Sequence, residues 1–331
     1  MKRQRRAFQS TAAGAMRDFL NYHRALGKRF DTEEWTLSQF DRYLMEQNVQ
    51  ALTAITPVMV ENFLSSRPRK AATSYNQLLG VLRGWFNWLV AQERLGQSPL
   101  HVAPRRVTAV RLPFLFEQDQ VRRLLAVAAK LPDDHQAHQR GLIYSTIFTL
   151  CYGLGLRVGE AVRLRVQDIA WDHCVLTIHD TKFAKSRLVP FGPKLAARLR
   201  DYVQQREAHA GRLLPDQPLF CFGPDKSRPI SPRTVSGTFY KVWTKLELKV
   251  PPGVAMPRLH CLRHSFAVTT LLRWYRQGTE PGDRLLHLST FMGHAHPSST
   301  AVYLTITADL LKEANQRFES FASPLLKGDI S

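Results

Sequence analysis

Cysteine is scarce in this 331-residue chain, and its spacing excludes several kinds of protein. The four cysteines lie far apart and form no CxxC pair; they are Cys151, Cys174, Cys221 and Cys261. Zinc ribbons need such pairs, and small disulfide-stapled domains need a denser set of cysteines. We therefore expect a protein of a reducing compartment, without a metal site or a disulfide framework.

Long apolar runs are missing as well. No stretch approaches the roughly 20 consecutive apolar residues that a membrane-spanning helix requires. The N-terminal residues 1–6 are strongly basic, but no apolar signal core follows them. The sequence predicts a soluble, intracellular protein of the cytoplasm.

Acidic residues are outnumbered: 46 lysines and arginines face 27 aspartates and glutamates, a net charge of +19. A basic surface gains free energy by displacing counterions from a polyanion, which favours nucleic acid as the partner. The alternatives are a merely soluble basic protein or one that sits on anionic lipid. Both halves of the chain are basic when it is divided at residue 110, which favours a clamp around DNA over a basic tail. The acidic residues form no cluster, which argues against a metal-dependent nuclease, and we expect no cofactor.

Helical periodicity dominates the first hundred residues. One apolar stripe contains Trp35, Phe40 and Tyr43, and a later one contains Trp85 and Phe86. Because these aromatic residues fall on apolar stripes, we expect them in a core rather than stacked on bases. The sequence predicts a helical bundle over residues 1–104.

A basic, proline-spaced segment follows this bundle. We interpret residues 105–113 as an interdomain linker in which Arg105 and Arg106 contact the DNA backbone. Residues 114–331 are then the second domain.

The second domain has one clear strand signal. Residues 175–178 and 187–190 predict a hairpin with Lys182 and Lys185 at its tip. Helices are expected at 117–130, 140–154, 193–208, 231–246, 258–276, 283–291 and 307–321. The fold class is therefore mainly α with a small β-sheet.

Several side chains point to phosphoryl-transfer chemistry only when they are taken together. His260 and Arg263 lie three residues apart on a predicted helix and share a face, yet such a pair is often a solvated surface feature. Arg157 could simply pair with Glu160. Two planar guanidinium groups with imidazole donors, however, suit a phosphodiester under attack, and Tyr303 supplies a nucleophile for a covalent intermediate.

The set of motifs resembles the phage integrase (tyrosine recombinase) family. The resemblance is carried by Gly155–Leu164, by the hairpin with Lys182, by the segment from His260 to His264, and by Gly293-His294 with Tyr303 nine residues after that histidine. It covers nearly the whole chain, since the N-terminal bundle is similar to that family's core-binding domain. The segment between Arg263 and Gly293 looks about two helical turns longer than in compact members, as in recombinases of mobile elements.

The resemblance implies a role for each matching residue. Arg157 and Arg263 would clamp the phosphate, and Tyr303 would attack it to give a 3′-phosphotyrosine. Lys182 would be the general acid, with Lys185 as the second claimant. His260 would donate or accept a proton and contact the phosphate, and His294 would hydrogen-bond the phosphate. The remaining expected roles are support of the first arginine for Glu160, DNA contact for Lys185 and Arg187, and structural or peripheral positions for His264, His287 and His296.

The implied function is site-specific DNA recombination through a Holliday junction, by four protomers on two DNA sites. Accessory DNA-bending proteins are further possible partners, and the amphipathic segment 309–321 would be an oligomerisation helix. Two alternatives stay open at this point. One is a type IB topoisomerase-like enzyme that relaxes DNA as a monomer, and the other is a non-catalytic DNA-binding protein on a recombinase scaffold.

Overall fold

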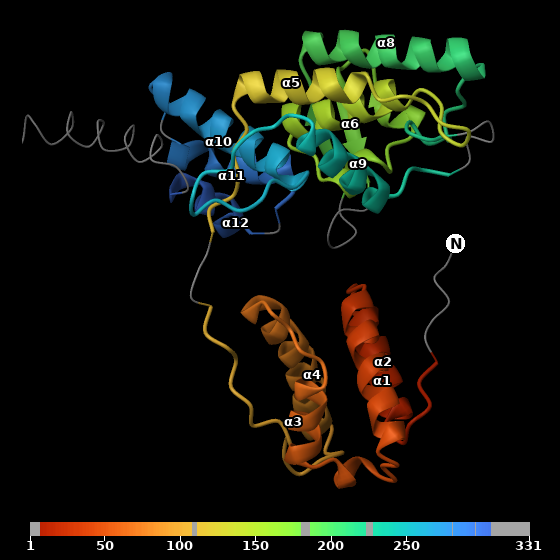
Figure 1. Ribbon diagram of the computed structural model, residues 1–331, viewed down its shortest axis with the longest axis vertical. Helices are drawn as coiled ribbons and strands as arrows, with labels where there is room; N and C mark the ends of the chain where they lie inside the picture. Colours follow the sequence, from red (N-terminus) through yellow and green to blue (C-terminus); the bar gives the residue numbers. More distant parts are fainter. Residues whose placement is uncertain are drawn as a thin grey trace, which may run out of the picture. The chain divides into compact units, whose positions relative to one another are not determined.

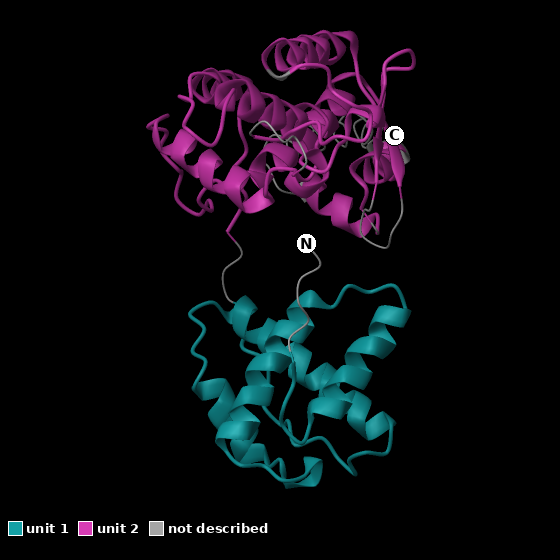
Figure 2. Ribbon diagram, turned by 90° about the vertical axis from the view of Figure 1, so that its right-hand side faces the viewer, with its two compact units in different colours: residues 1–110 teal, residues 111–331 magenta. Residues whose placement is uncertain are grey.

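The computed structural model describes residues 7–107, 111–179, 186–222, 228–279, 281–294 and 296–305. The chain divides into two compact units, residues 1–110 and 111–331 (Figure 2). The division falls inside the segment that the sequence marks as a linker. Within the described ranges, no helix is long and apolar enough to cross a membrane.

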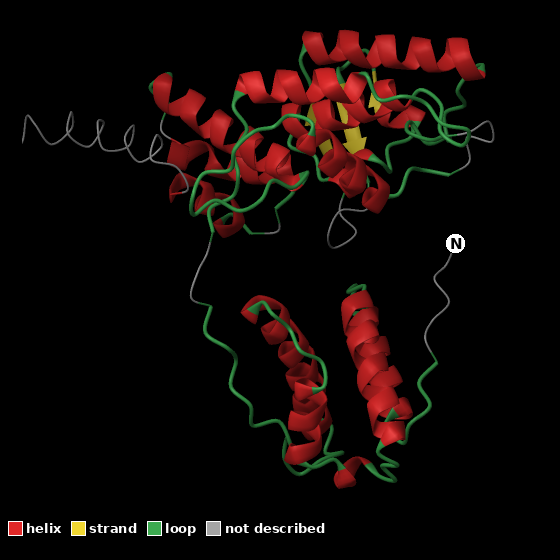
Figure 3. Ribbon diagram, viewed as in Figure 1, coloured by secondary structure: helices red, strands yellow, loops and turns green. Residues whose placement is uncertain are grey.

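In the described part of the first unit, loops connect helices, and no β-strand is present (Figure 3). The helices are α1 (Ala13–Ala25), α2 (Asp31–Glu46), the short 3-10 helix η1 (Leu52–Ala54), α3 (Pro57–Ser65) and α4 (Ala72–Ala91). The sequence specifies where α3 begins. The Thr56 hydroxyl accepts a hydrogen bond from the Met59 N–H at 3.3 Å, and Pro57 occupies the first turn.

The core of the first unit is aromatic. Trp85 and Phe86 of α4 are fully buried and pack against Phe40 of α2, which confirms their assignment to a core. Trp35 is the exception: 40% of its surface is exposed, and the Arg69 guanidinium lies 5.9 Å from its ring centroid. The prediction of a core position was wrong for Trp35, which lies at the start of its helix, beside the stripe rather than in it.

The second unit combines helices with a small sheet. Its elements are α5 (Gln118–Ala129), α6 (Arg140–Gly153), α7 (Val158–Ala161), η2 (Val166–Asp168), β1 (Ile169–Ala170), β2 (Val175–Ile178), β3 (Arg187–Pro190), α8 (Pro193–Ala210), α9 (Pro232–Thr244), α10 (His260–Arg276), α11 (Pro281–Met292), α12 (Ser298–Ala301) and η3 (Val302–Thr305). The strands are antiparallel in the order β1-β2-β3, and Leu176 pairs with Val189 in register. The predicted hairpin is confirmed, whereas β1 is too short for its periodicity to show in the sequence.

Helix α6 is the centre of the second unit. α5, α8 and α10 all pack against it (Figure 1). A separate apolar cluster joins α10, α11 and η3 through Leu271, Met292 and Tyr303. This second cluster fixes the ends of the elements that carry the candidate site. The helix expected at 307–321 lies outside the described residues.

Candidate active site

The turn after α6 positions the first arginine. Gly155 adopts φ +59°, a left-handed conformation that L side chains rarely take, and a Cβ there would lie 2.5 Å from the Phe266 ring. The chain then enters the short helix α7. There the Arg157 backbone N–H donates to Glu160 Oε2 at 2.9 Å, and its Nη1 donates to Oε1 at 2.8 Å. One carboxylate thus fixes both the main chain and the side chain of Arg157.

A second guanidinium binds the same carboxylate from the sheet. Arg187 of β3 donates from Nη1 and Nη2 to the two Glu160 oxygens at 3.0 and 2.9 Å. Burial alone would raise the pKa of the Glu160 carboxyl, but the hydrogen bonds and charge of Arg187, followed by Arg157, lower it to about 2. Glu160 is therefore a permanent anion at neutral pH.

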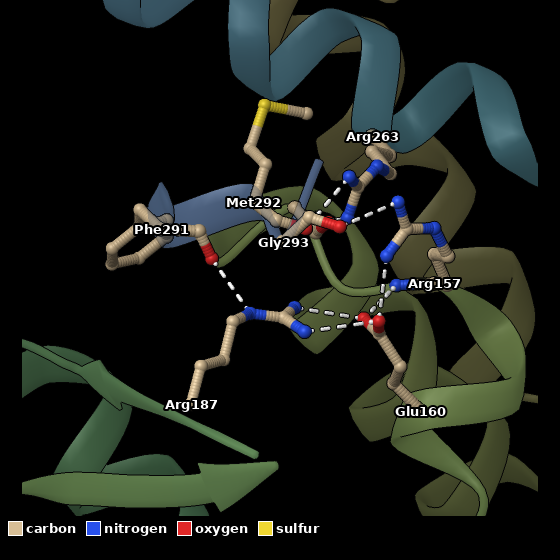
Figure 4. A network of polar contacts seen from close by, with 8 residues as sticks. Arg157, Glu160, Arg187, Arg263, Phe291, Met292 and Gly293 are labelled. Carbon is tan, nitrogen blue, oxygen red and sulfur yellow. Dashed lines mark hydrogen bonds and ion pairs between the residues drawn. The ribbon is translucent and has the colours of Figure 1, made fainter. Parts of the chain in front are cut away.

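The C-terminal end of α11 holds three arginines, each through a different backbone carbonyl (Figure 4). Arg187 Nε donates to Phe291 O at 2.9 Å, and Arg263 Nη2 donates to Met292 O at 2.8 Å. Arg157 Nη2 donates to Gly293 O at 2.9 Å. The last carbonyls of a helix have no partner within the helix and lie at its negative end, so cations stabilise them. This helix end aligns side chains that come from three separate elements.

Gly293 makes this arrangement possible. It ends α11 with φ +69°, its N–H bonds to Thr290 O, and the next N–H, of His294, bonds to Ser289 O. These two bonds define a Schellman motif, in which glycine is preferred. A Cβ at position 293 would lie only 2.6 Å from Arg187 Nη1, so a side chain there would also displace the guanidinium.

Arg263 is the most deeply buried of the three arginines, with 1% of its surface exposed. Its Nη1 donates to Gly155 O, while its Nε has no hydrogen-bond partner among the described residues. Burial, then the neighbouring Arg157, lowers the pKa of Arg263 to about 10. We call Arg157, Glu160, Arg187 and Arg263 the anchor cluster. The cluster contains three guanidinium groups and one carboxylate, which binds Arg157 and Arg187, so the cluster keeps a net positive charge.

Four rings form the other part of the site, and we call them the ring cluster: His260, His264, His294 and Tyr303. The Tyr303 hydroxyl on η3 is hydrogen-bonded to His264 Nδ1 at 2.8 Å. The His260 and His264 rings meet edge to face at 4.6 Å, and the His294 ring lies nearly parallel to Tyr303 at 6.3 Å. His294 Nδ1 is 2.6 Å from the hydroxyl of the buried Thr300, which fixes the orientation of its ring.

The environment keeps all three histidines of the ring cluster neutral at pH 7. Burial by surrounding protein, then nearby positive groups, lowers the pKa of His260 and of His294 to about 4. The same causes lower the pKa of His264. Burial raises the pKa of Tyr303, although Arg263 and Arg157 oppose the shift. The site therefore combines fixed positive charge with neutral imidazoles and a protonated tyrosine.

Such a site can bind a phosphodiester and present a hydroxyl nucleophile to it. The guanidinium groups offer donors to the non-bridging oxygens, and Tyr303 supplies the attacking atom. No group of three histidine, cysteine, aspartate or glutamate side chains suited to a metal occurs in the described ranges.

The structure brings most of the residues proposed from sequence together. Five of them interact electrostatically or through ring contacts: Arg157, His260, Arg263, His294 and Tyr303. Glu160 supports Arg157, as expected. Lys182 and Lys185 lie outside the described residues.

The sequence interpretation needs correction at Arg187. We expected it to contact DNA, but only 9% of its side chain is exposed and it pairs with Glu160. From sequence alone, a buried arginine at the base of a hairpin cannot be told from a solvated one. The partner of Arg187, Glu160, lies 27 residues away along the chain, so no local spacing indicates the pair. Arg105 and Arg106 are exposed in the first unit, and the Arg105 guanidinium lies 3.8 Å from the Tyr75 ring centroid.

His264 was missed as a site residue. We expected a structural or peripheral role, and the structure places its ring in contact with the hydroxyl of Tyr303. The available signal was its spacing, because His264 lies four residues after His260 and therefore on the same helix face. His287 and His296, the other two histidines assigned to the periphery, are exposed.

Comparisons with known proteins agree with this geometry. A family model described as the phage integrase family matches residues 115–309. A Sinorhizobium fredii protein named as an integrase/recombinase, y4rB, is 32% identical over 94% of this chain and 98% of its own length. The tyrosine recombinase XerA of Pyrococcus furiosus is 31% identical over 74% of this chain and 73% of its own length. Among solved structures, the Tn1549 transposon integrase with a circular intermediate DNA superposes with a TM-score of 0.64 at 15% identity, covering 92% of this chain and 99% of that one.

Proposed function

The chain belongs to the phage integrase family of tyrosine recombinases, and on that premise we propose that it cuts and rejoins DNA at specific sites with Tyr303 as the nucleophile. The observation that carries this proposal is the position of the Tyr303 hydroxyl. It lies within the ring cluster, close enough to Arg263 and Arg157 for their charges to act on it. A nucleophile and phosphate-binding groups therefore share one site.

The proposed reaction needs no external energy source. The Tyr303 oxygen attacks the phosphorus of a DNA strand, a phosphotyrosine bond forms at the 3′ phosphate, and the bond to the 5′ oxygen breaks. Arg157 and Arg263 stabilise the charge that develops on the non-bridging oxygens, with His260 and His294 as further donors. The phosphotyrosine retains the bond energy, so a 5′ hydroxyl of the partner strand can reverse the step and reseal the DNA.

The leaving 5′ oxygen needs a proton. We assign this role to Lys182, with Lys185 as the second candidate, because a lysine ammonium can act as a general acid and both residues lie between β2 and β3 in the sequence. A 5′-bridging phosphorothiolate substrate tests the assignment, since its sulfur leaves without protonation. This substrate should restore cleavage by the Lys182→Ala variant. If it restores cleavage by Lys185→Ala instead, Lys185 is the general acid.

Recombination also requires assembly and a cellular setting. We propose that four protomers act on two DNA sites through a Holliday junction, with residues 309–321 joining neighbouring protomers. We further propose that the exposed Arg105 and Arg106 contact the DNA backbone. We also propose that the protein recombines the DNA of a mobile element in the bacterial cytoplasm, and the superposition on a transposon integrase supports this proposal. Accessory DNA-bending proteins would be further partners.

Covalent trapping tests the proposal and identifies the DNA site in the same experiment. A pool of nicked duplexes with randomised sequence is incubated with protein in EDTA, and adducts that survive SDS are recovered and sequenced. The wild type should enrich one motif, whereas Tyr303→Phe should yield no adduct. Adducts formed by Tyr303→Phe would contradict the assignment of the nucleophile. Joining of two duplexes that carry the selected motif separates recombination from simple relaxation of supercoils.

A further inference from the structure

We propose that His264 is the general base that takes the proton from Tyr303 when it attacks, a role that rests on the proposed function. The two residues are joined directly, with Tyr303 Oη at 2.8 Å from His264 Nδ1. This distance is within hydrogen-bond reach, the first requirement for proton transfer. His264 therefore touches the reacting atom of the nucleophile.

The other two histidines of the ring cluster make different contacts, including His260, for which the family resemblance implies a role as proton donor or acceptor. His294 lies nearly parallel to the Tyr303 ring at 6.3 Å, and its Nδ1 is engaged with Thr300. His260 meets the edge or face of His264 rather than the tyrosine hydroxyl. Of the three histidines in the ring cluster, His264 is the one bonded to the Tyr303 hydroxyl.

The protonation states on both sides of this bond suit the transfer. Burial, followed by the charge of Arg263, lowers the pKa of His264, so its ring is neutral and able to accept a proton at pH 7. Burial raises the pKa of Tyr303, so the hydroxyl does not ionise by itself near neutral pH. The groups that face this pair are His260 and Arg263 on α10, His294 after α11, and Arg157 before α7.

The step balances without a further reactant. As the bond from Tyr303 Oη to phosphorus forms, the hydroxyl proton moves to His264 Nδ1, and the departing 5′ oxygen takes a proton from the general acid. In rejoining, the phosphotyrosine bond breaks and His264 returns its proton to Tyr303. His264 acts on the nucleophile alone, which distinguishes it from the group that protonates the leaving oxygen.

The variant His264→Asn tests this role. Its side-chain amide can occupy the position of Nδ1 and accept a hydrogen bond, but it cannot take a proton. On the duplex selected with wild-type protein, we expect the rate of adduct formation at pH 7 to fall at least about 100-fold, the usual range for loss of a general base. DNA binding in a gel-shift assay should change less than about threefold. His135→Ala, at an exposed histidine between α5 and α6, is the control and should react at the wild-type rate.

The pH profile separates a base from a merely structural residue. The wild-type rate should rise with pH and level off above the pKa of His264, which is below its usual 6.5. In His264→Asn the rate should keep rising about tenfold per pH unit up to pH 9, because hydroxide must then ionise Tyr303. A 5′-phosphorothiolate substrate should not restore this variant, since the defect is not at the leaving group.

A measurement without DNA keeps the contact testable on its own. With 3-fluorotyrosine at position 303, the fluorine signal of the wild type should shift as His264 titrates, and His264→Asn should abolish that shift. Equal adduct rates in wild type and His264→Asn, or a full rescue by phosphorothiolate, would overturn the role of His264 alone. A wild type that shows the fluorine shift but forms no adduct on any duplex would overturn the proposed function, and the base role with it.

Discussion

The anchor cluster and the ring cluster meet at one site, but different interactions hold them. The anchor cluster consists of ions: Glu160 pairs with two guanidinium groups, those of Arg157 and Arg187, and all three arginines bond to a carbonyl at the end of α11. The ring cluster consists of neutral groups in edge, face and hydrogen-bond contact. Around neutral pH the first stays charged, whereas the second stays neutral and consists of groups that can accept or donate a proton. The difference indicates a division of labour between fixing a phosphate and moving protons.

Removing the shared carboxylate should break the anchor cluster. In Glu160→Gln the buried Arg187 loses its counterion, and loss of one partner of a buried ion pair costs about 3–5 kcal/mol. We expect the free energy of unfolding, measured with denaturant, to fall by about that amount. Asp172→Asn, at an exposed carboxylate of the same unit, is the matched control. An equal effect of the two substitutions would show that the ion pairs contribute nothing beyond surface charge.

A methyl group at the end of α11 should disturb the same cluster less. In Gly293→Ala the left-handed backbone is strained and the Cβ meets Arg187, so we expect a loss of about 2–3 kcal/mol. Gly237→Ala, in the interior of α9 with nothing within 4 Å of the new Cβ, should instead be neutral or stabilise by up to about 1 kcal/mol. Thermal unfolding of both variants measures the contrast. Equal shifts would contradict a special role for the helix end.

Acid should separate the two clusters by pH. The native pKa of His294 is about 4, below the ordinary 6.5, so the unfolded chain binds more protons in this range and stability falls as pH drops from 6.5 to 4. Glu160 has the depressed pKa of a paired carboxyl, so its contribution is complete above 4.5 and is lost as pH falls toward 2. Denaturant unfolding across pH should show a flatter upper range in His294→Gln and a flatter lower range in Glu160→Gln. Identical slopes in both variants would refute this separation.

The smallest effect on stability is expected at the nucleophile. Tyr303→Phe removes one hydrogen bond to His264 and leaves the packed ring in place, which should cost only about 0.5–1.5 kcal/mol. Covalent adducts should nevertheless disappear. Denaturant unfolding and SDS-resistant adducts, measured on the same preparation, check both parts. A loss above about 3 kcal/mol would mean that the ring cluster is structural rather than reactive.

The sequence predicted those parts of the molecule that side-chain identity determines locally. Helical periodicity and the hairpin signal gave the fold class, and the family resemblance placed Arg157, Arg263 and Tyr303. Arg187 was misjudged because its partner Glu160 is remote along the chain.

Backbone acceptors were beyond prediction for a different reason. The carbonyls of residues 291–293 hold three arginines, but any residue type supplies a carbonyl. Of residues 291–293, only Gly293 has a residue type that indicates a helix end. The contact of His264 with Tyr303 depends on how η3 packs against α10, which no local pattern specifies.

The three carbonyls at the end of α11 also bear on protein engineering. A designer who copied the arginines, histidines and tyrosine onto another scaffold would transfer every reactive group and still leave the guanidinium groups without their common support. The smallest portable unit is therefore the helix end with Gly293, together with the turn at Gly155 that meets Arg263. For this site, the backbone of the helix end determines where the reactive side chains lie.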